Sequence, residues 1–172
     1  MTHDTRVTLL FVLMSSLSYF IHQIMHEIIP NLWLGDCHDA HDIVQLTAHN
    51  IKTIINCTND IEMVQGTCIA CWRFGVDDID DEKEHMKLLE FLSDIMGIIC
   101  DAHEINQPVL VHCKMGRQRS ACVVAAYLMW GEDMSKETAI AIIKTKKRDA
   151  FFPEVNFDDT LSMFEKNLEP IP

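Results

Sequence analysis

The sequence predicts an α/β fold in which a central, mostly parallel sheet of about four to five strands is flanked by helices. Three observations favour this class. Short apolar runs typical of buried strands alternate with longer segments of helical periodicity, and strand and helix follow each other along most of the chain. The third observation is size, because 172 residues, 48% hydrophobic and 23% charged, suit one soluble domain with one core.

The predicted strands are short and rich in isoleucine, leucine and valine, as buried strands are. The last of them is the central strand, because it is apolar throughout and leads into a distinctive loop. In chain order the strands cover residues 29–34, 51–57, 67–76 and 108–112.

The predicted helices fill the segments between and after these strands. The helix over residues 119–130 is apolar nearly all round and should therefore be buried. Ser135 is the expected N-cap of the helix that follows. In chain order the helices cover residues 39–48, 82–103, 119–130, 135–147 and 155–167.

Residues 1–26 form a separate N-terminal extension, in which residues 7–25 are mostly apolar. Leu17, Phe20 and Ile24 share one helical face, which predicts an amphipathic helix that packs on the domain or on a second copy in a homodimer. Membrane association is a less favoured alternative, because serines and other polar residues interrupt the stretch. A signal peptide or an incorrectly assigned start is the third interpretation.

The charge and the cysteines limit the partners and the compartment. The formal net charge is -12, which argues against nucleic acid or an anionic membrane as the main partner, since both need a basic face. The seven cysteines show no disulfide framework, which favours a reducing compartment such as the cytoplasm. Cys68 and Cys71 form a lone CxxC. We expect an ordinary strand pair there rather than a zinc or redox site, because no second ligand pair is evident.

The segment from Val109 to Ser120 is the most informative part of the chain. An apolar strand ends in His112 and Cys113, a loop with one glycine follows, and an apolar helix begins near Arg119. A helix N-terminus presents unpaired backbone N–H groups and binds anions. A thiol held among such groups favours the thiolate, which is the nucleophilic form. The pattern therefore predicts an anion cradle with a cysteine nucleophile at its floor.

This string has the form H-C-x5-R-S and resembles the signature of the cysteine-dependent protein phosphatases, and more narrowly that of the small dual-specificity phosphatases. Further segments match that family in the same order: Ile29 to Gly35, Ile51 to Thr58, Ala125 to Met129, and Pro153 to Phe157 with Leu161, Phe164 and Glu165. The resemblance covers residues 27–167. It implies a three-layer fold like that of the protein tyrosine phosphatases, a catalytic domain over residues 27–168, and no metal or cofactor.

The resemblance assigns a role to each residue of the loop. Cys113 attacks phosphorus and forms a phosphocysteine, while Arg119 binds two phosphate oxygens through its planar fork. Ser120 helps the thiolate to leave in the second step, and His112 orients the loop rather than acting as a base. The phosphate-binding residues are Lys114, Met115, Gly116, Arg117, Gln118 and Arg119.

A general acid must protonate the leaving oxygen, and the acidic run after the third predicted strand supplies it. In the family the acid lies in a pattern like I-P-V-x-D, which places Asp78 in that role. This chain departs from the pattern at Gly75, where proline is common. Asp77 and Asp80 therefore remain as alternatives.

The short chain favours a shallow pocket that admits phosphotyrosine as well as phosphoserine and phosphothreonine of proteins. Lys114 and Arg117 favour an alternative, because two more cations beside the phosphate suit phosphoinositides, inositol polyphosphates or RNA 5′-phosphates. A non-catalytic phosphoprotein-binding module is an interpretation of another class, although such modules usually lack the cysteine or the arginine. A small zinc protein built on the CxxC is a further one.

Overall fold

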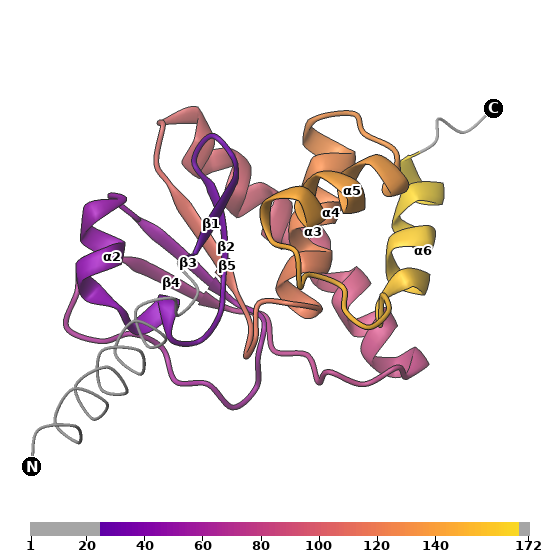
Figure 1. The fold of residues 1–172 in the computed structure, drawn as a ribbon, viewed down its shortest axis with the longest axis horizontal. Helices are drawn as coiled ribbons and strands as arrows, with labels where there is room; N and C mark the ends of the chain where they lie inside the picture. Colours follow the sequence, from indigo (N-terminus) through magenta and orange to yellow (C-terminus); the bar gives the residue numbers. More distant parts are fainter. Residues whose placement is uncertain (1–24, 169–172) are drawn as a thin grey trace, which may run out of the picture.

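The computed structural model describes residues 25–168, which form one α/β unit (Figure 1). The predicted helix of residues 1–26, with its homodimer, membrane and signal interpretations, lies outside these residues apart from Met25 and His26. No helix among the described residues is both long and apolar enough to cross a membrane. The elements are β1 (His26–Ile29), β2 (Leu32–Gly35), the 3-10 helix η1 (Asp39–His41), α2 (Ile43–Ala48), β3 (Thr53–Asn56), β4 (Ala70–Arg73), α3 (Glu82–Glu104), β5 (Val109–His112), α4 (Arg119–Gly131), α5 (Lys136–Lys146) and α6 (Asp158–Leu168).

The sheet has five strands in the order β1-β2-β5-β3-β4. The neighbours from β2 to β4 pair in parallel, and β1 alone pairs antiparallel, with β2. This arrangement confirms the predicted mostly parallel sheet flanked by helices.

The predicted strand over residues 29–34 is only partly correct: residues 32–34 lie in β2, but the strand is interrupted at residues 30 and 31. Pro30 and Asn31 form the turn of a hairpin between β1 and β2. Pro30 lacks a backbone N–H for the sheet, and Asn31 has a φ of 66°, in the left-handed region that asparagine tolerates better than most residues. The predicted helix over 39–48 is likewise divided into η1 and α2, because the Asp42 side chain accepts from the N–H groups of Val44 and Gln45 and caps a new helix.

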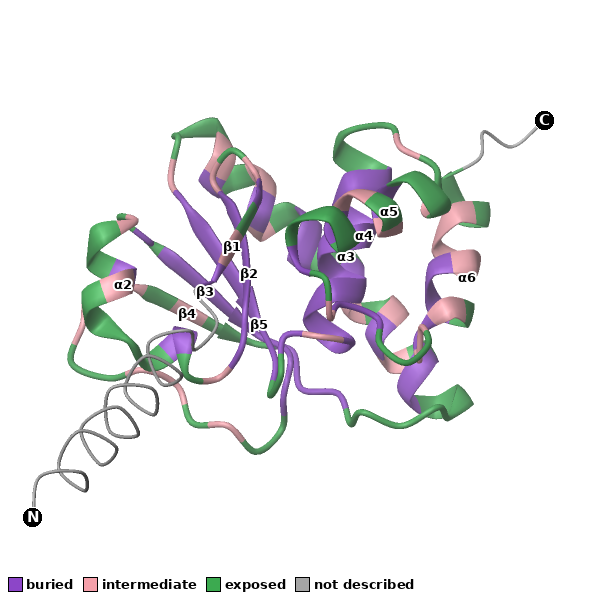
Figure 2. Ribbon diagram, in the orientation of Figure 1, coloured by how far each residue is buried: buried purple, intermediate pink, exposed green. Residues whose placement is uncertain are grey.

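The core lies on both faces of the sheet, because alternate strand residues point to opposite sides. Val109 and Val111 of β5 join the larger cluster, which packs against α3, α4, α5 and α6. Leu110 joins the smaller cluster beside η1 and α2. Helix α4 is buried along most of its length, as its sequence predicts (Figure 2). The Ser135 side chain accepts from the Thr138 N–H and caps α5, which confirms the predicted N-cap.

Candidate active site

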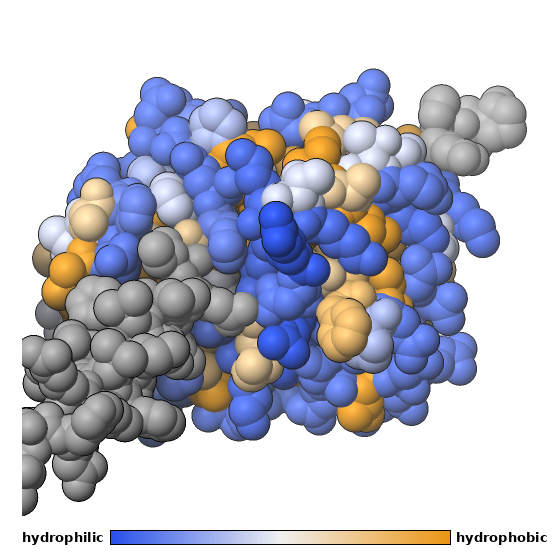
Figure 3. Space-filling model, viewed as in Figure 1, coloured by the Kyte–Doolittle hydropathy of each residue, from blue (hydrophilic) through white to orange (hydrophobic). Residues whose placement is uncertain are grey.

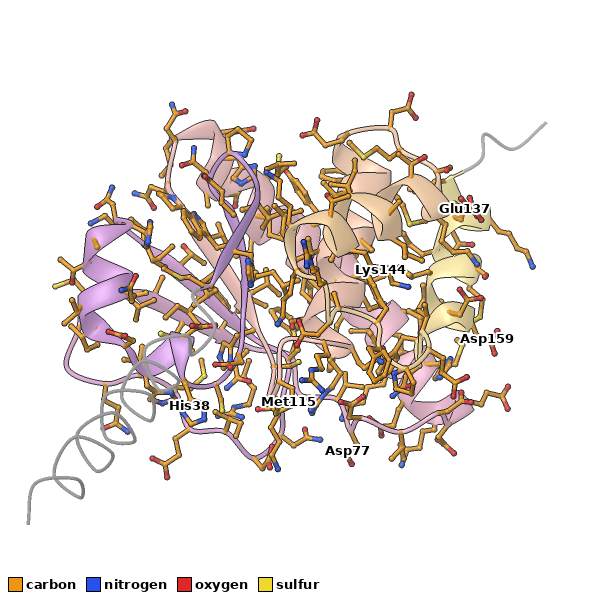
Figure 4. All side chains as sticks on the ribbon, viewed as in Figure 1. His38, Asp77, Met115, Glu137, Lys144 and Asp159 are labelled. Atoms are coloured by element: carbon orange, nitrogen blue, oxygen red, sulfur yellow. The ribbon has the colours of Figure 1, made fainter. Side chains whose placement is uncertain are left out.

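The candidate active site lies at the edge of the sheet where three parallel strands end together. Gly35 of β2, His112 of β5 and Asn56 of β3 are direct neighbours in the register, so the loops that follow them start side by side. His38, Met115 and Asp77, which belong to three different loops, lie along this same edge in Figure 4. The face shown in Figure 3 is mainly hydrophilic over the middle of the molecule, with scattered apolar side chains. Ligands of open α/β sheets bind at the carboxyl ends of the strands, so this edge is the expected place for a site.

The loop between β5 and α4 packs tightly against the end of β2. The Cys37 N–H donates to the Lys114 carbonyl oxygen at 3.3 Å. Gly116 has a φ of 65°, and a Cβ at this position would lie 2.6 Å from the carbonyl oxygen of Gly35. Glycine is therefore required at 116 both by its backbone conformation and by the space available.

Cys113 and Ser120 meet across the base of this loop. The Ser120 hydroxyl donates to the Cys113 sulfur at 3.2 Å, and both side chains are buried. The two residues lie seven positions apart, and the loop and the first turn of α4 bring them together. The structure thus pairs the predicted nucleophile with the hydroxyl that was predicted to assist it.

Arg119 is held at the first position of α4 with its guanidinium buried. One terminal nitrogen donates to the Val76 carbonyl oxygen at 3.0 Å, and the other lies 3.4 Å from the Asp78 carboxylate. Its buried Nε has no hydrogen-bond partner among the described residues. Buried polar groups are nearly always paired. The unpaired N–H of the Arg119 guanidinium is therefore a donor that an anion bound in the loop would engage.

Each of the three candidate acids has a different partner. Asp78 accepts from the Asn156 side-chain amide at 3.1 Å and also faces Arg119. Asp77 accepts from the Asn59 amide at 2.7 Å, and Asp80 lies 3.2 Å from the ring of His85. Of the three carboxylates, the structure thus places Asp78 in contact with the predicted phosphate-binding arginine.

Gly75, where the family usually has proline, is explained by its surroundings. A Cβ at this position would collide with the Asn59 side chain and would lie 3.0 Å from the Thr58 carbonyl oxygen. The amide of the same Asn59 side chain donates to the Asp77 carboxylate. The glycine at position 75 therefore lets the acidic segment pack closely on the loop after β3.

Gln118 has a role that its place in the loop did not reveal. Its amide nitrogen donates to the carbonyl oxygens of Phe152 and Glu154, at 3.3 and 2.7 Å, and its amide oxygen accepts from the Asn156 N–H at 3.2 Å. Gln118 thereby fixes the segment whose Asn156 side chain holds Asp78. Asn156 was within a segment matched to the family, but no sequence signal connects it with a residue 78 positions away.

The two extra cations of the loop have different surroundings. The Nε of Arg117 lies 2.8 Å from the Asp149 carboxylate, and the buried Lys147 ammonium lies 2.7 Å from the other oxygen of that carboxylate. Lys114 is exposed and forms no ion pair within residues 25–168. Asp149 therefore offsets part of the charge of Arg117 and Lys147, and Lys114 is the loop cation that faces solvent. Met115 beside it is 46% exposed.

Three titratable groups near the loop, His112, Cys57 and Cys122, are uncharged at neutral pH. Burial lowers the pKa of His112 to about 4, and its Nδ1 lies 3.3 Å from the Cys113 carbonyl oxygen. Burial raises the pKa of the Cys57 and Cys122 thiols. These three groups therefore add no charge beside the loop. No group of three or more His, Cys, Asp or Glu side chains in the described part of the chain is arranged to hold a metal ion.

Known proteins resemble this chain in sequence and in fold. A family model described as the dual specificity phosphatase catalytic domain matches residues 32–167. The chain belongs to the dual-specificity phosphatase family. The family and the fold predicted from the sequence are thus confirmed, and the fold is also that of human DUSP28, whose crystal structure has a TM-score of 0.79 at 26% identity over 87% of this chain and 98% of that chain.

Two relatives of this family member are larger proteins. Protein phosphatase Slingshot of Drosophila melanogaster is 33% identical over 144 residues, which cover 83% of this chain and 13% of Slingshot. Dual specificity protein phosphatase 6 of Homo sapiens is 32% identical over 142 residues, which cover 83% of this chain and 36% of that protein. This chain thus spans less than half the length of either relative.

Proposed function

We propose that this chain hydrolyses phosphate monoesters of phosphorylated proteins, on tyrosine and on serine or threonine, through a phosphocysteine intermediate and without a cofactor. Family membership supports the reaction class. The observation that carries the proposal is the loop from Cys113 to Ser120, in which the thiol accepts from Ser120 at 3.2 Å while the buried Nε of Arg119 has no partner among the described residues.

In the first step the Cys113 thiolate attacks phosphorus, and the bond between phosphorus and the ester oxygen breaks. Arg119 and the backbone N–H groups of residues 114–119 hold the equatorial oxygens, where negative charge develops. Asp78 donates its proton to the departing oxygen. Its contact with Arg119 at 3.4 Å supports this role, since it keeps the carboxyl beside the phosphate-binding group.

In the second step a water molecule attacks the phosphocysteine, and the bond between sulfur and phosphorus breaks. Asp78, now ionised, accepts the proton of the water as it attacks. The Ser120 hydroxyl donates to the departing sulfur, which lowers the cost of releasing a thiolate inside a buried site. Inorganic phosphate then leaves, and Cys113 is free for another cycle.

A protein substrate is favoured over a polyphosphorylated small molecule by the charges around the loop. Of the two extra loop cations, Arg117 is already engaged by Asp149 at 2.8 Å, so Lys114 is the one loop cation beside the phosphate site that has no ion pair within residues 25–168. The exposed side chain of Met115 offers an apolar contact to the residue that carries the phosphate.

A free catalytic thiol requires reducing surroundings, so the expected compartment is the cytoplasm. The catalytic domain spans residues 27–168, and a homodimer through residues 1–26 stays a prediction.

A panel of phosphorylated substrates tests this function. Phosphate release is measured from phosphotyrosine and phosphothreonine peptides, a phosphoinositide, an inositol polyphosphate and a 5′-triphosphate RNA. We expect release from the peptides, unchanged by EDTA, and loss of release in Cys113→Ser but not in the control Cys68→Ser, which alters an exposed thiol. If phosphate is released faster from the phosphoinositide, the inositol polyphosphate or the RNA than from the peptides, the proposal of a protein substrate is wrong. Unchanged release by Cys113→Ser would overturn the reaction itself.

A further inference from the structure

Strand β4 forms an open edge of the sheet. It pairs with β3 on one side and has no strand on its other side among residues 25–168. The N–H groups of Ala70 and Phe74 donate toward β3, to the carbonyl oxygens of Lys52 and Asn56. Because backbone groups alternate in direction along a strand, the N–H groups of Cys71 and Arg73 point to the open side. An open edge of this kind is a template for another strand.

A groove runs between this edge and helix α3. Apolar side chains from both elements line it, and Trp72 is 48% exposed there. Phe74 and Ile98 extend the apolar lining on the strand and helix sides. The groove therefore offers a ladder of backbone groups beside an apolar surface, which are the two features that an extended peptide needs.

Gly97 lies in the interior of α3 and faces this groove. Glycine inside a helix costs about 1 kcal/mol relative to alanine. A Cβ at this position would have no heavy atom within 4 Å, so nothing among the described residues requires a glycine here. The bare backbone leaves room for another chain to approach the helix closely.

The groove is also acidic. Asp94 and Asp101 line it and lie three residues before and four residues after Gly97, so they flank it on one face of the helix. Neither forms an ion pair within the described residues. Arg73 is the one cationic residue of the lining, and its guanidinium donates to the carbonyl oxygens of Thr58 and Ile61.

We propose that the groove between β4 and α3 is a docking site for an extended, positively charged segment of a partner protein, which adds a strand to β4. The segment bonds through its main chain to the outward backbone groups of Cys71 and Arg73. Its apolar side chains contact Trp72, and its lysine or arginine side chains pair with Asp94 and Asp101. This site is independent of the phosphate-binding loop.

Fluorescence anisotropy tests the proposal with a labelled peptide whose side chains on one strand face are alternately valine and lysine, with threonine at the intervening positions, because alternate strand residues share a face. The same peptide with glutamate in place of lysine is the charge-reversed probe. The wild-type chain should bind the basic peptide and not the acidic one. The double variant Asp94→Asn, Asp101→Asn should bind about tenfold more weakly, since two exposed ion pairs contribute up to about 1 kcal/mol each. Its matched control is Glu137→Gln with Asp159→Asn, which removes the same charge from exposed positions of α5 and α6 (Figure 4).

Gly97→Ala separates docking from stability. The substitution should shift the urea midpoint of unfolding upward, because alanine is the better helix former, yet weaken peptide binding. Amide hydrogen exchange at Cys71 and Arg73 should slow when the peptide binds, which marks an added strand. Phosphate release from a small aryl phosphate should stay unchanged in every variant. Equal peptide binding by wild type and Gly97→Ala, an equal loss in the control, or no binding by wild type would each overturn the docking site.

Discussion

Asn156→Ala tests how the acid is held. The substitution removes the amide that donates to the Asp78 carboxylate at 3.1 Å and leaves the backbone bond from Asn156 to Gln118 in place. A hydrogen bond to a charged group contributes about 1.5–3 kcal/mol, and we take the lower value because the Asp78 side chain is 34% exposed. A loss of about 1.5 kcal/mol in transition-state stabilisation corresponds to about a tenfold fall in rate.

The leaving group makes this prediction specific. A general acid matters most when the departing oxygen is a poor leaving group, so kcat/KM for phenyl phosphate should fall about tenfold in Asn156→Ala. With 2,4-dinitrophenyl phosphate, whose phenolate leaves without a proton, kcat/KM should change little. This ratio of kcat/KM values reports the step in which the phosphocysteine forms.

The other two carboxylates supply matched controls. Asn59→Ala frees Asp77 and His85→Gln alters the partner of Asp80, so each perturbs one alternative acid through its own neighbour. Neither should change the dependence on the leaving group. The reasoning is refuted if Asn59→Ala or His85→Gln shows the selective loss on phenyl phosphate while Asn156→Ala behaves like wild type.

Three further substitutions test the loop and its support. Arg119→Lys should lower kcat/KM about a hundredfold with little change in the melting temperature, because an ammonium cannot hold two oxygens in a plane. Gly116→Ala should lower the free energy of unfolding by about 1–3 kcal/mol in urea titrations, given its φ of 65° and the approach to Gly35. Burial raises the pKa of Asp39 from 3.8 to about 7, so the protonated carboxyl is favoured in the folded state. The stability of the wild type relative to Asp39→Asn should therefore be greatest below about pH 4 and fall by up to about 4 kcal/mol as the pH rises through 7; a flat difference would contradict this.

The local features of this chain were predictable from its sequence. The strand, loop and helix around Cys113 follow from one continuous apolar pattern with a single glycine, and Ser135 caps α5 through a residue three positions away. The alternation of strands and helices was enough to predict a mostly parallel sheet. The first predicted strand was only partly correct, because its apolar content gave no sign of the hairpin turn in which Asn31 takes a left-handed conformation.

The long-range contacts of the site could not be read from the sequence. The chain from Gln118 through Asn156 to Asp78 joins three segments that meet only in the folded protein. The pairing of Arg117 with Asp149 spans 32 positions, and it changes the charge that a substrate meets. Such contacts depend on how loops pack at the ends of strands, where periodicity carries no information.

Trapping the intermediate tests the central claim most directly. The chain is mixed with a phosphotyrosine peptide, quenched in acid within the first turnover, digested and examined by mass spectrometry. We predict one phosphoryl group on Cys113 and none in Cys113→Ser. With 2,4-dinitrophenyl phosphate, whose phenolate leaves without a proton, Asp78→Asn should hold more phosphocysteine than the wild type, because only the hydrolysis step is then slowed. Phosphate on another residue, or turnover without any phosphocysteine, would contradict the proposed mechanism.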